Sequence, residues 1–105
     1  MIGGQHIFNM NIVQCNTVIK DLKDDFDSHD FIRKFMEKFP AEYGELLKTH
    51  NNVNTAHAEI GRYLLENSCD YSEKLEIKQI GVVDSLNVFL NMTPNALWHK
   101  ILKQQ

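Results

Sequence analysis

The sequence predicts a small α+β domain in which helices dominate. Apolar residues recur at helical spacing in residues 28–50 and 54–68, whereas they alternate with polar residues in residues 75–90. A Thr-Pro pair then opens another helical pattern, in residues 94–103. We therefore expect an αα-hairpin of 28–50 and 54–68, a short β-hairpin within 75–90 and a C-terminal helix at 94–103. The chain has 105 residues, about the length of one domain, so residues 1–105 are expected to share one core.

The N-terminal residues favour a strand. Phe8, Met10 and Ile12 alternate with polar residues, which is the period of a half-buried strand. Such a strand would present a free edge to which a second chain could pair. The alternative is that residues 1–9 form a disordered leader, because Met10 is itself a possible start of the chain.

A short helix is expected next, and acidic residues then precede the N-terminus of a longer helix. The apolar residues with helical spacing are Val18, Ile19 and Leu22, and Thr17 can cap them. The acidic run at residues 24–27 suits the start of the following helix, because the helix dipole stabilises negative charge there. Asp27 or Ser28 can serve as its N-cap. Neighbouring carboxylates on one segment do not converge as the ligands of a hard cation must, so we expect no metal there.

Residues 28–50 carry one apolar stripe that stays in phase across Pro40. Its members are Phe31, Ile32, Phe35, Met36, Phe39, Tyr43, Leu46 and Leu47. Pro40 lacks an amide proton and its ring crowds the preceding turn, so the helix either kinks there or restarts with Pro40 as its first residue. We favour a kinked or stepped helix that keeps both halves on one core. Phe39 and Tyr43 should then face the same core as Phe35.

The second helix of the predicted hairpin follows a short polar connector. Asn51 suits a helix end, because asparagine tolerates left-handed backbone angles. Ala56, Ile60 and Leu64 lie on one face of residues 54–68. Together with Trp98 from the last segment, these apolar faces predict the core. It should include Phe31, Phe35, Phe39, Leu46, Ile60, Leu64 and Trp98.

The last third of the chain favours two strands and a final helix. Gly81 or the Asp84-Ser85 pair can supply a turn between two short strands within 75–90. Thr93 as N-cap and Pro94 as first helical residue then predict a helix start.

Charge and cysteine content exclude several classes of protein. The formal net charge is −3 and no segment forms a basic arm, which weakens nucleic acid as a partner because phosphate contacts supply most of such affinity. Cys15 and Cys69 stand far apart and outside metal-binding spacings, so we expect free thiols in a reducing compartment. No signal peptide or membrane span is recognisable. We expect a cytoplasmic protein that does not bind membranes.

The histidines and hydroxyls do not form a recognisable catalytic pattern. His50 and His57 flank the helix connector and could approach each other, but no metal-ligand spacing supports a site, and we interpret both as solvated. Ser28, His29 and Asp30 are consecutive, whereas the members of a catalytic triad converge from separate elements. His29 is expected at the surface of a first helical turn. We therefore expect neither an enzyme nor a cofactor or metal site.

Two stretches carry a resemblance. A set of short uncharacterised bacterial proteins contains stretches that resemble FDSHDFIRKF and NVFLNMTPNALWHKI of this chain. Those proteins pair an SHDFI helix start with a late Asn-Val-Phe or Asn-Ile-Phe and a Trp-His-Lys-Ile or Trp-Arg-Lys-Ile ending. The similarity covers about residues 28–49 and 86–102 of this chain. The set has no assigned activity, so the resemblance implies a recurring small module and no chemistry.

Two classes of function remain. The favoured one is a non-catalytic protein-interaction or regulatory module that can associate with itself, because large apolar residues are in surplus and catalytic patterns are lacking. The alternative is a winged-helix-like DNA-binding regulator, with 40–50 and 54–68 as the helix pair and 75–90 as the wing. Its expected nucleic-acid contacts are Asn54, His57, Arg62, Lys74 and Lys78, helped by Thr55 and Glu59 on the same helix face.

Overall fold

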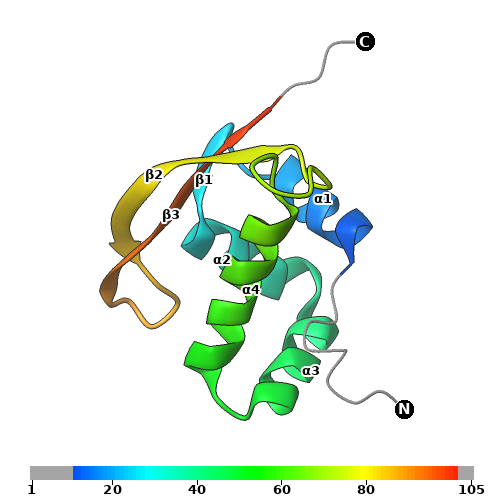
Figure 1. The fold of residues 1–105 in the computed structure, drawn as a ribbon. Helices are drawn as coiled ribbons and strands as arrows, with labels where there is room; N and C mark the ends of the chain where they lie inside the picture. Colours follow the sequence, from blue (N-terminus) through cyan, green and yellow to red (C-terminus); the bar gives the residue numbers. More distant parts are fainter. Residues whose placement is uncertain (1–10, 102–105) are drawn as a thin grey trace.

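Four helices and three strands make up residues 11–101, the part of the chain that the computed structural model describes. In chain order they are α1 (Ile12–Lys20), β1 (Asp25–Asp27), α2 (Ser28–Lys38), α3 (Pro40–His50), α4 (Val53–Asn67), β2 (Ile77–Leu86) and β3 (Met92–Lys100). Figure 1 shows the sheet on one side of the molecule, with α4 running beside it and α3 at the far end. The predicted α+β class is confirmed.

The three strands form one antiparallel sheet in the order β1-β3-β2. The short β1 covers one end of β3, where Phe26 pairs with Trp98. Along β2 the register shifts between Gln79 and Gly81, so Ile80 is an extra residue in a β-bulge. The long β2–β3 hairpin therefore has β1 beside it at its base and extends beyond β1 toward its tip.

The N-terminal prediction is wrong where the structure can be compared with it. Residue Ile12 begins α1 and does not lie in a strand. Asn11 and Gln14 form a capping box, in which each side chain accepts a hydrogen bond from the other residue's backbone amide. This cap starts the helix earlier than its apolar spacing indicates, and Thr17 lies inside it. Phe8 and Met10 lie outside the described residues.

Pro40 divides residues 28–50 into two helices, with Pro40 at the start of α3. Asp27 caps α2 through a capping box with Asp30. The apolar stripe nevertheless stays on one core, because the Phe35 ring lies 6.4 Å from the Phe39 ring and 6.0 Å from the Tyr43 ring. The predicted phase across the proline is thus confirmed.

The predicted αα-hairpin of 28–50 and 54–68 is replaced by three consecutive helices. Residues Asn51 and Asn52 join α3 to α4. Asn51 adopts left-handed angles with φ 51°, and the Asn52 side chain caps α4 by accepting from the Thr55 amide.

The C-terminal helix predicted at 94–103 is wrong: residues Met92–Lys100 form β3. The Thr93-Pro94 signal is local, whereas Trp98 gains its burial and its hydrogen bond from residues far along the chain, and this tertiary packing overrides the local preference. Pro94 is tolerated because β3 is paired on its β2 side alone there, β1 having ended opposite Leu97.

The short β-hairpin predicted within 75–90 is also misplaced. Residues 77–86 form one continuous strand, and its partner is β3. Neither Gly81 nor Asp84-Ser85 is a turn. The turn occupies residues 87–91, where the Asn87 side chain accepts from the amides of Phe89 and Asn91.

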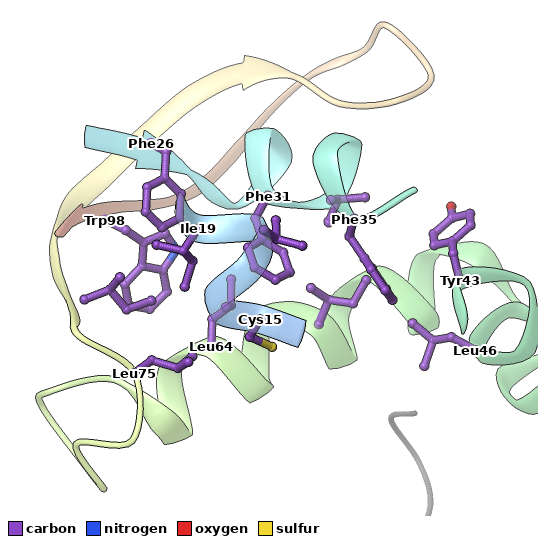
Figure 2. Close-up of a cluster of buried hydrophobic side chains, with 14 of the residues drawn as sticks. Cys15, Ile19, Phe26, Phe31, Phe35, Tyr43, Leu46, Leu64, Leu75 and Trp98 are labelled. Atoms are coloured by element: carbon purple, nitrogen blue, oxygen red, sulfur yellow. The ribbon is translucent and has the colours of Figure 1, made fainter. Parts of the chain in front are cut away.

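The core lies between the helices and one face of the sheet (Figure 2). Trp98, Phe26 and Leu75 close its sheet end, while Tyr43 and Leu46 of α3 close the opposite end. Of the predicted core residues, Phe31, Phe35, Leu46, Ile60, Leu64 and Trp98 are buried, and Phe39 is half-buried against them.

Candidate interaction surface on the β2–β3 hairpin

The inner face of the hairpin meets the start of α2 through polar side chains. Asn95 on β3 accepts a hydrogen bond from the His29 backbone amide at 2.8 Å. Its amide group donates to the Val83 carbonyl and to the Ser85 hydroxyl, each at 3.1 Å. The two ring nitrogens of His29 lie 2.8 Å from Ser85 Oγ and 3.3 Å from Thr93 Oγ1. The side chains of His29, Ser85, Thr93 and Asn95, which we call the inner network, thus connect α2 to both strands.

The position of His29 corrects the prediction of a surface residue. It is 8% exposed, because the hairpin folds over the first turn of α2. Beside it, the buried Ser28 hydroxyl accepts a hydrogen bond from Trp98 Nε1 at 3.0 Å. Among the described residues, no buried side-chain nitrogen or oxygen lacks a partner. This neighbourhood is therefore a satisfied structural contact.

His57 joins the hairpin tip to α3 and α4, which corrects its interpretation as solvated. Its Nε2 lies 2.7 Å from the Tyr43 hydroxyl, and its ring stacks on Phe89 with centroids 6.2 Å apart. Burial lowers the pKa of His57, and the charge that His29 can carry lowers it further. Burial also raises the pKa of Tyr43, so at neutral pH a protonated hydroxyl and an uncharged imidazole share this hydrogen bond.

A groove of about 460 Å³ separates α4 from the inner face of the hairpin. Its polar lining includes His29, His57, Asn54 and Asn95, and its apolar lining includes Ile32 and Trp98. Most of these polar groups are already hydrogen-bonded within the protein. The groove therefore does not present a convergent set of free donors and acceptors to a small molecule.

A larger groove of about 850 Å³ borders α2 on another side, next to Val88 of the hairpin tip. Two ion pairs lie on its rim, Arg33 with Asp30 and Lys34 with Glu37. A third pair joins Asp21 of the rim to Lys38, which lies outside the lining. These pairs neutralise most of the charge of the rim, and Lys23 is the remaining charged residue of its lining.

The outer face of the hairpin is apolar and open to solvent. Val82 and Met92 are 65% and 64% exposed, Ile80 and Leu86 are 48% and 43% exposed, and Leu90 at the tip is 75% exposed. We call Ile80, Val82, Leu86, Leu90 and Met92 the outer patch. The register places Leu86 opposite Met92, Asp84 opposite Pro94 and Val82 opposite Ala96 on this face, so one charged side chain lies among the apolar ones.

The distal half of the hairpin therefore has inverted polarity. Ser85, Thr93 and Asn95 point inward to α2, whereas Val82, Leu86 and Met92 point to solvent. A half-buried strand normally places its apolar residues toward the core. Residues 92–96 alternate between apolar and polar types, but Thr93 and Pro94 favoured a helix start there, and residues 82–86 do not alternate. The sequence therefore did not indicate which side chains of the hairpin face the core.

The predicted nucleic-acid contacts do not gather in one place. His57 is half-buried under Phe89, at the end of α4 where Asn54 is exposed. Arg62 forms ion pairs with Glu59 and Glu66 on its own helix, and both hydrogen bonds raise its pKa. Lys74 lies in the loop after α4 and Lys78 near the start of β2, at the base of the hairpin.

The buried Cys15 is not placed for chemistry. Both thiols are free, and burial raises the pKa of Cys15 to about 12. The thiolate is the reactive form, so Cys15 is inert at neutral pH. Residues 11–101 contain no group of three or more His, Cys, Asp or Glu side chains arranged to hold a metal ion.

No family model, curated protein or solved structure matches the chain. Within residues 11–101, every helix is too short or too polar to span a lipid bilayer.

Proposed function

We propose that this chain is a non-catalytic protein-interaction module whose docking surface is the outer patch of the β2–β3 hairpin. The observation that carries the proposal is the inverted polarity of the distal hairpin. Its buried face has polar side chains that hold it on α2, and its exposed face has large apolar ones on either side of Asp84. Contiguous apolar surface on a soluble domain commonly marks a site that another molecule covers.

The ordered tip supports this role. Asn87 forms hydrogen bonds through its side chain to Phe89 and Asn91, and its backbone amide donates to the Asn91 carbonyl at 2.9 Å. Leu90 has φ 64°, a left-handed conformation that glycine or asparagine normally occupies. A leucine in this conformation carries a conformational cost, and its side chain is exposed. A rigid apolar tip loses little conformational entropy when it docks.

The second candidate function is DNA binding, and the order of the elements favours it. The chain begins with a helix and a short strand, continues with three further helices and ends in a long hairpin, and the sheet order is β1-β3-β2. This arrangement is typical of winged-helix domains. In that analogy α4 would be the recognition helix and the β2–β3 hairpin the wing. Folds host many functions, so the analogy supports an arrangement and not an activity.

The charges on α4 argue against DNA as the main partner. Arg62 is the single cationic residue of α4 that carries a permanent charge, and Glu59 and Glu66 already pair with it. Phosphate contacts supply most non-specific affinity for DNA, and this helix face offers no unpaired cation to make them. The wing tip is apolar rather than basic. We therefore rank the protein-interaction module first.

Site-specific photo-crosslinking tests the ranking. A photoreactive amino acid at position 82 samples the outer patch, and one at position 55, exposed on α4, samples the other candidate surface. In the cells that produce the protein, we expect discrete protein adducts from position 82, lost when Met92→Asp is added. Adducts to nucleic acid from position 55, with none from position 82, would contradict the proposal.

A salt titration tests the alternative directly. Binding to random duplex DNA is measured at rising salt for the wild type and for the Lys74→Ala, Lys78→Ala double variant. We expect no binding at low salt. Micromolar binding whose logarithm falls steeply with the logarithm of salt concentration, and which the double variant weakens, would establish the DNA-binding alternative.

A further inference from the structure

The β2–β3 hairpin carries a single ionisable side chain between residues 79 and 98, and this side chain lies in the middle of the apolar face. It is Asp84, which lies opposite Pro94 in the register. Four apolar residues surround this pair on the same face: Val82, Leu86, Met92 and Ala96. Apolar side chains of both strands therefore enclose one carboxylate.

Asp84 has no partner within the described monomer. Its side chain is exposed, and among residues 11–101 it forms neither an ion pair nor a hydrogen bond. Arg33 of α2 reaches the hairpin, but its guanidinium donates to the Leu86 carbonyl at 2.8 Å and pairs with Asp30. Water solvates the Asp84 carboxylate while the face is uncovered, and any molecule that covers the face has to replace that water.

We propose that the outer patch binds a different protein whose apolar surface carries one cationic side chain, an arginine or a lysine, placed to meet Asp84. The inference rests on the proposed function, because it names the chemistry of the partner on the same docking surface. Covering a carboxylate without a compensating charge is strongly unfavourable, whereas a well-placed cation offsets the lost water. Apolar side chains around that cation cover Val82, Leu86 and Met92.

The same carboxylate argues against other occupants of this face. A second copy of the chain, packed about a two-fold axis through the middle of the face, would bring its own Asp84 against the first. Like charges in a contact that excludes water repel each other, and residues 79–98 contain no cation to compensate them. A nucleic acid or an anionic lipid surface would likewise bring phosphate groups to a carboxylate. Charge complementarity therefore favours a cationic protein partner.

Peptide selection on the folded protein tests the chemistry of this partner. The probe is a phage-displayed library of random linear peptides, selected on the wild-type chain. Peptides that also bind the Val82→Asp variant are removed, so that the remaining ones require the outer patch. We expect these peptides to share one arginine or lysine between apolar residues. Arginine should predominate, because its planar guanidinium can donate to both oxygens of a carboxylate.

Charge exchange with one selected peptide tests the pairing with Asp84. Asp84→Lys sets two cations together, and we expect it to raise the dissociation constant of the peptide about tenfold or more. Replacing the cation of the peptide by glutamate should weaken binding to the wild type by a similar factor. The same peptide should regain its affinity on the Asp84→Lys variant, where the charges are again opposite. Fluorescence anisotropy measures all four combinations.

Asp24→Lys is the matched control for Asp84→Lys. It makes the same charge change at an exposed residue that precedes β1, near the base of the sheet. At physiological salt, screening should keep its effect on the dissociation constant within about twofold. Circular dichroism of each variant checks that these exposed substitutions leave the fold intact.

Four results would overturn the inference. Selected peptides without a shared cation would show that Asp84 does not determine the partner. Equal binding to the wild type and to Asp84→Lys would show that no charge pairs with this residue. Failure to select any peptide that distinguishes the wild type from Val82→Asp would show that the face binds no such segment. A dimer in sedimentation analysis that Val82→Asp dissociates would show that a second copy covers the face.

The failure of this inference is distinguishable from that of the proposed function. If position 82 crosslinks to another protein and Asp84→Lys leaves those adducts unchanged, the interaction module stands and the cationic partner is rejected. If position 82 forms no adduct and no peptide is selected, both are rejected. Adducts to a different protein that Asp84→Lys abolishes and Asp24→Lys leaves in place, together with the charge exchange in the peptide, support both.

Discussion

The two faces of the β2–β3 hairpin differ in the polarity of their side chains and in whether those side chains are buried. The inner face buries polar side chains, and the inner network satisfies them on the start of α2. The outer face exposes Ile80, Val82 and Met92, which contact no core. The same two strands therefore hold the domain together on one side and leave apolar surface uncovered on the other. Position in the fold, and not residue type, decides which side chains stabilise the monomer.

The energetic difference between the faces follows from what each contact replaces. A hydrogen bond in the inner network replaces bonds to water, so each contributes about 0.5–1.5 kcal/mol to stability. An exposed apolar side chain remains in water in the folded monomer and contributes nothing by burial. The outer patch would stabilise something only once covered, at about 25 cal/mol per Å² of apolar area removed from water. Substitutions on the two faces should therefore differ sharply in their effects.

Trp98 on the base of β3 should show the largest effect on stability. The side chain is 1% exposed and its Nε1 donates to Ser28. We expect Trp98→Ala to lower the free energy of unfolding by about 3–5 kcal/mol, since it opens a large cavity. Urea unfolding followed by circular dichroism measures this. Trp98→Phe, which keeps most of the volume and loses the hydrogen bond, should cost less and stay folded.

Met92→Ala on the outer face is the matched control. It removes a large apolar side chain from the same strand, and we expect a change within about 0.5 kcal/mol in dilute monomer. Equal losses from Trp98→Ala and Met92→Ala would break the comparison, because Met92 at the distal end of β3 would then be as buried as Trp98 at its base.

His29 should give the next largest effect. His29→Ala removes the ring from both hydroxyls in a part-buried site, which leaves Ser85 with Asn95 as its remaining partner and Thr93 without this contact. We expect a loss of about 1–3 kcal/mol in the free energy of unfolding. His99→Ala is the control, because His99 is exposed and pairs at the surface with Asp25. A His29→Ala variant as stable as the His99→Ala variant would mean that the inner network does not hold the hairpin.

The helical part of this fold was largely predictable from local signals. Asp27 caps α2, Asn51 ends α3 with left-handed angles, and the stripe through Phe35 and Phe39 keeps its phase across Pro40. Each of these depends on residues within a few positions of one another. A short helix through Val18 and Ile19 was predicted, but its start was missed because it lies in the Asn11–Gln14 capping box, within a segment whose alternation favoured a strand.

The hairpin was predicted poorly because non-local contacts determine it. The Thr93-Pro94 pair is a sound helix signal, yet Trp98 is held by Ser28, 70 residues away. His29 was interpreted as a surface residue because the strands that bury it come 56 or more residues later in the chain. Strand pairing of this range leaves no short sequence pattern. The candidate surface consequently became visible only once the inner and outer faces were assigned.

The contact between His57 and the tip should make stability depend on pH. Burial lowers the pKa of His57 in the folded protein, whereas in the unfolded chain it titrates near its ordinary value of about 6.5. Between those two values the unfolded chain binds more protons, so stability falls as pH decreases through this window. The contribution is complete above about pH 6.5.

Unfolding measured across this window, with NMR titration of the His57 ring, tests that expectation. His57→Gln should remove the His57 part of the pH dependence while His50→Gln leaves it in place. A folded pKa above the ordinary value would reverse the slope and contradict the burial of His57 between Tyr43 and Phe89.

The smallest expected effect concerns the centre of the outer patch. Val82→Thr keeps the shape and the β-branched preference for a strand but adds a hydroxyl on the outer face. Because Val82 is exposed, the hydroxyl stays in water, and dilute protein should change by no more than about 0.5 kcal/mol. At a buried site the same change would cost about 1–3 kcal/mol, since the hydroxyl would lose its water without gaining a partner. Unfolding measured at low and high protein concentration separates these cases. A cost that is absent in dilute solution and grows with concentration would show the outer face being covered by a second copy, whereas a large cost at every concentration would place Val82 inside the monomer and refute the division of the hairpin into two faces.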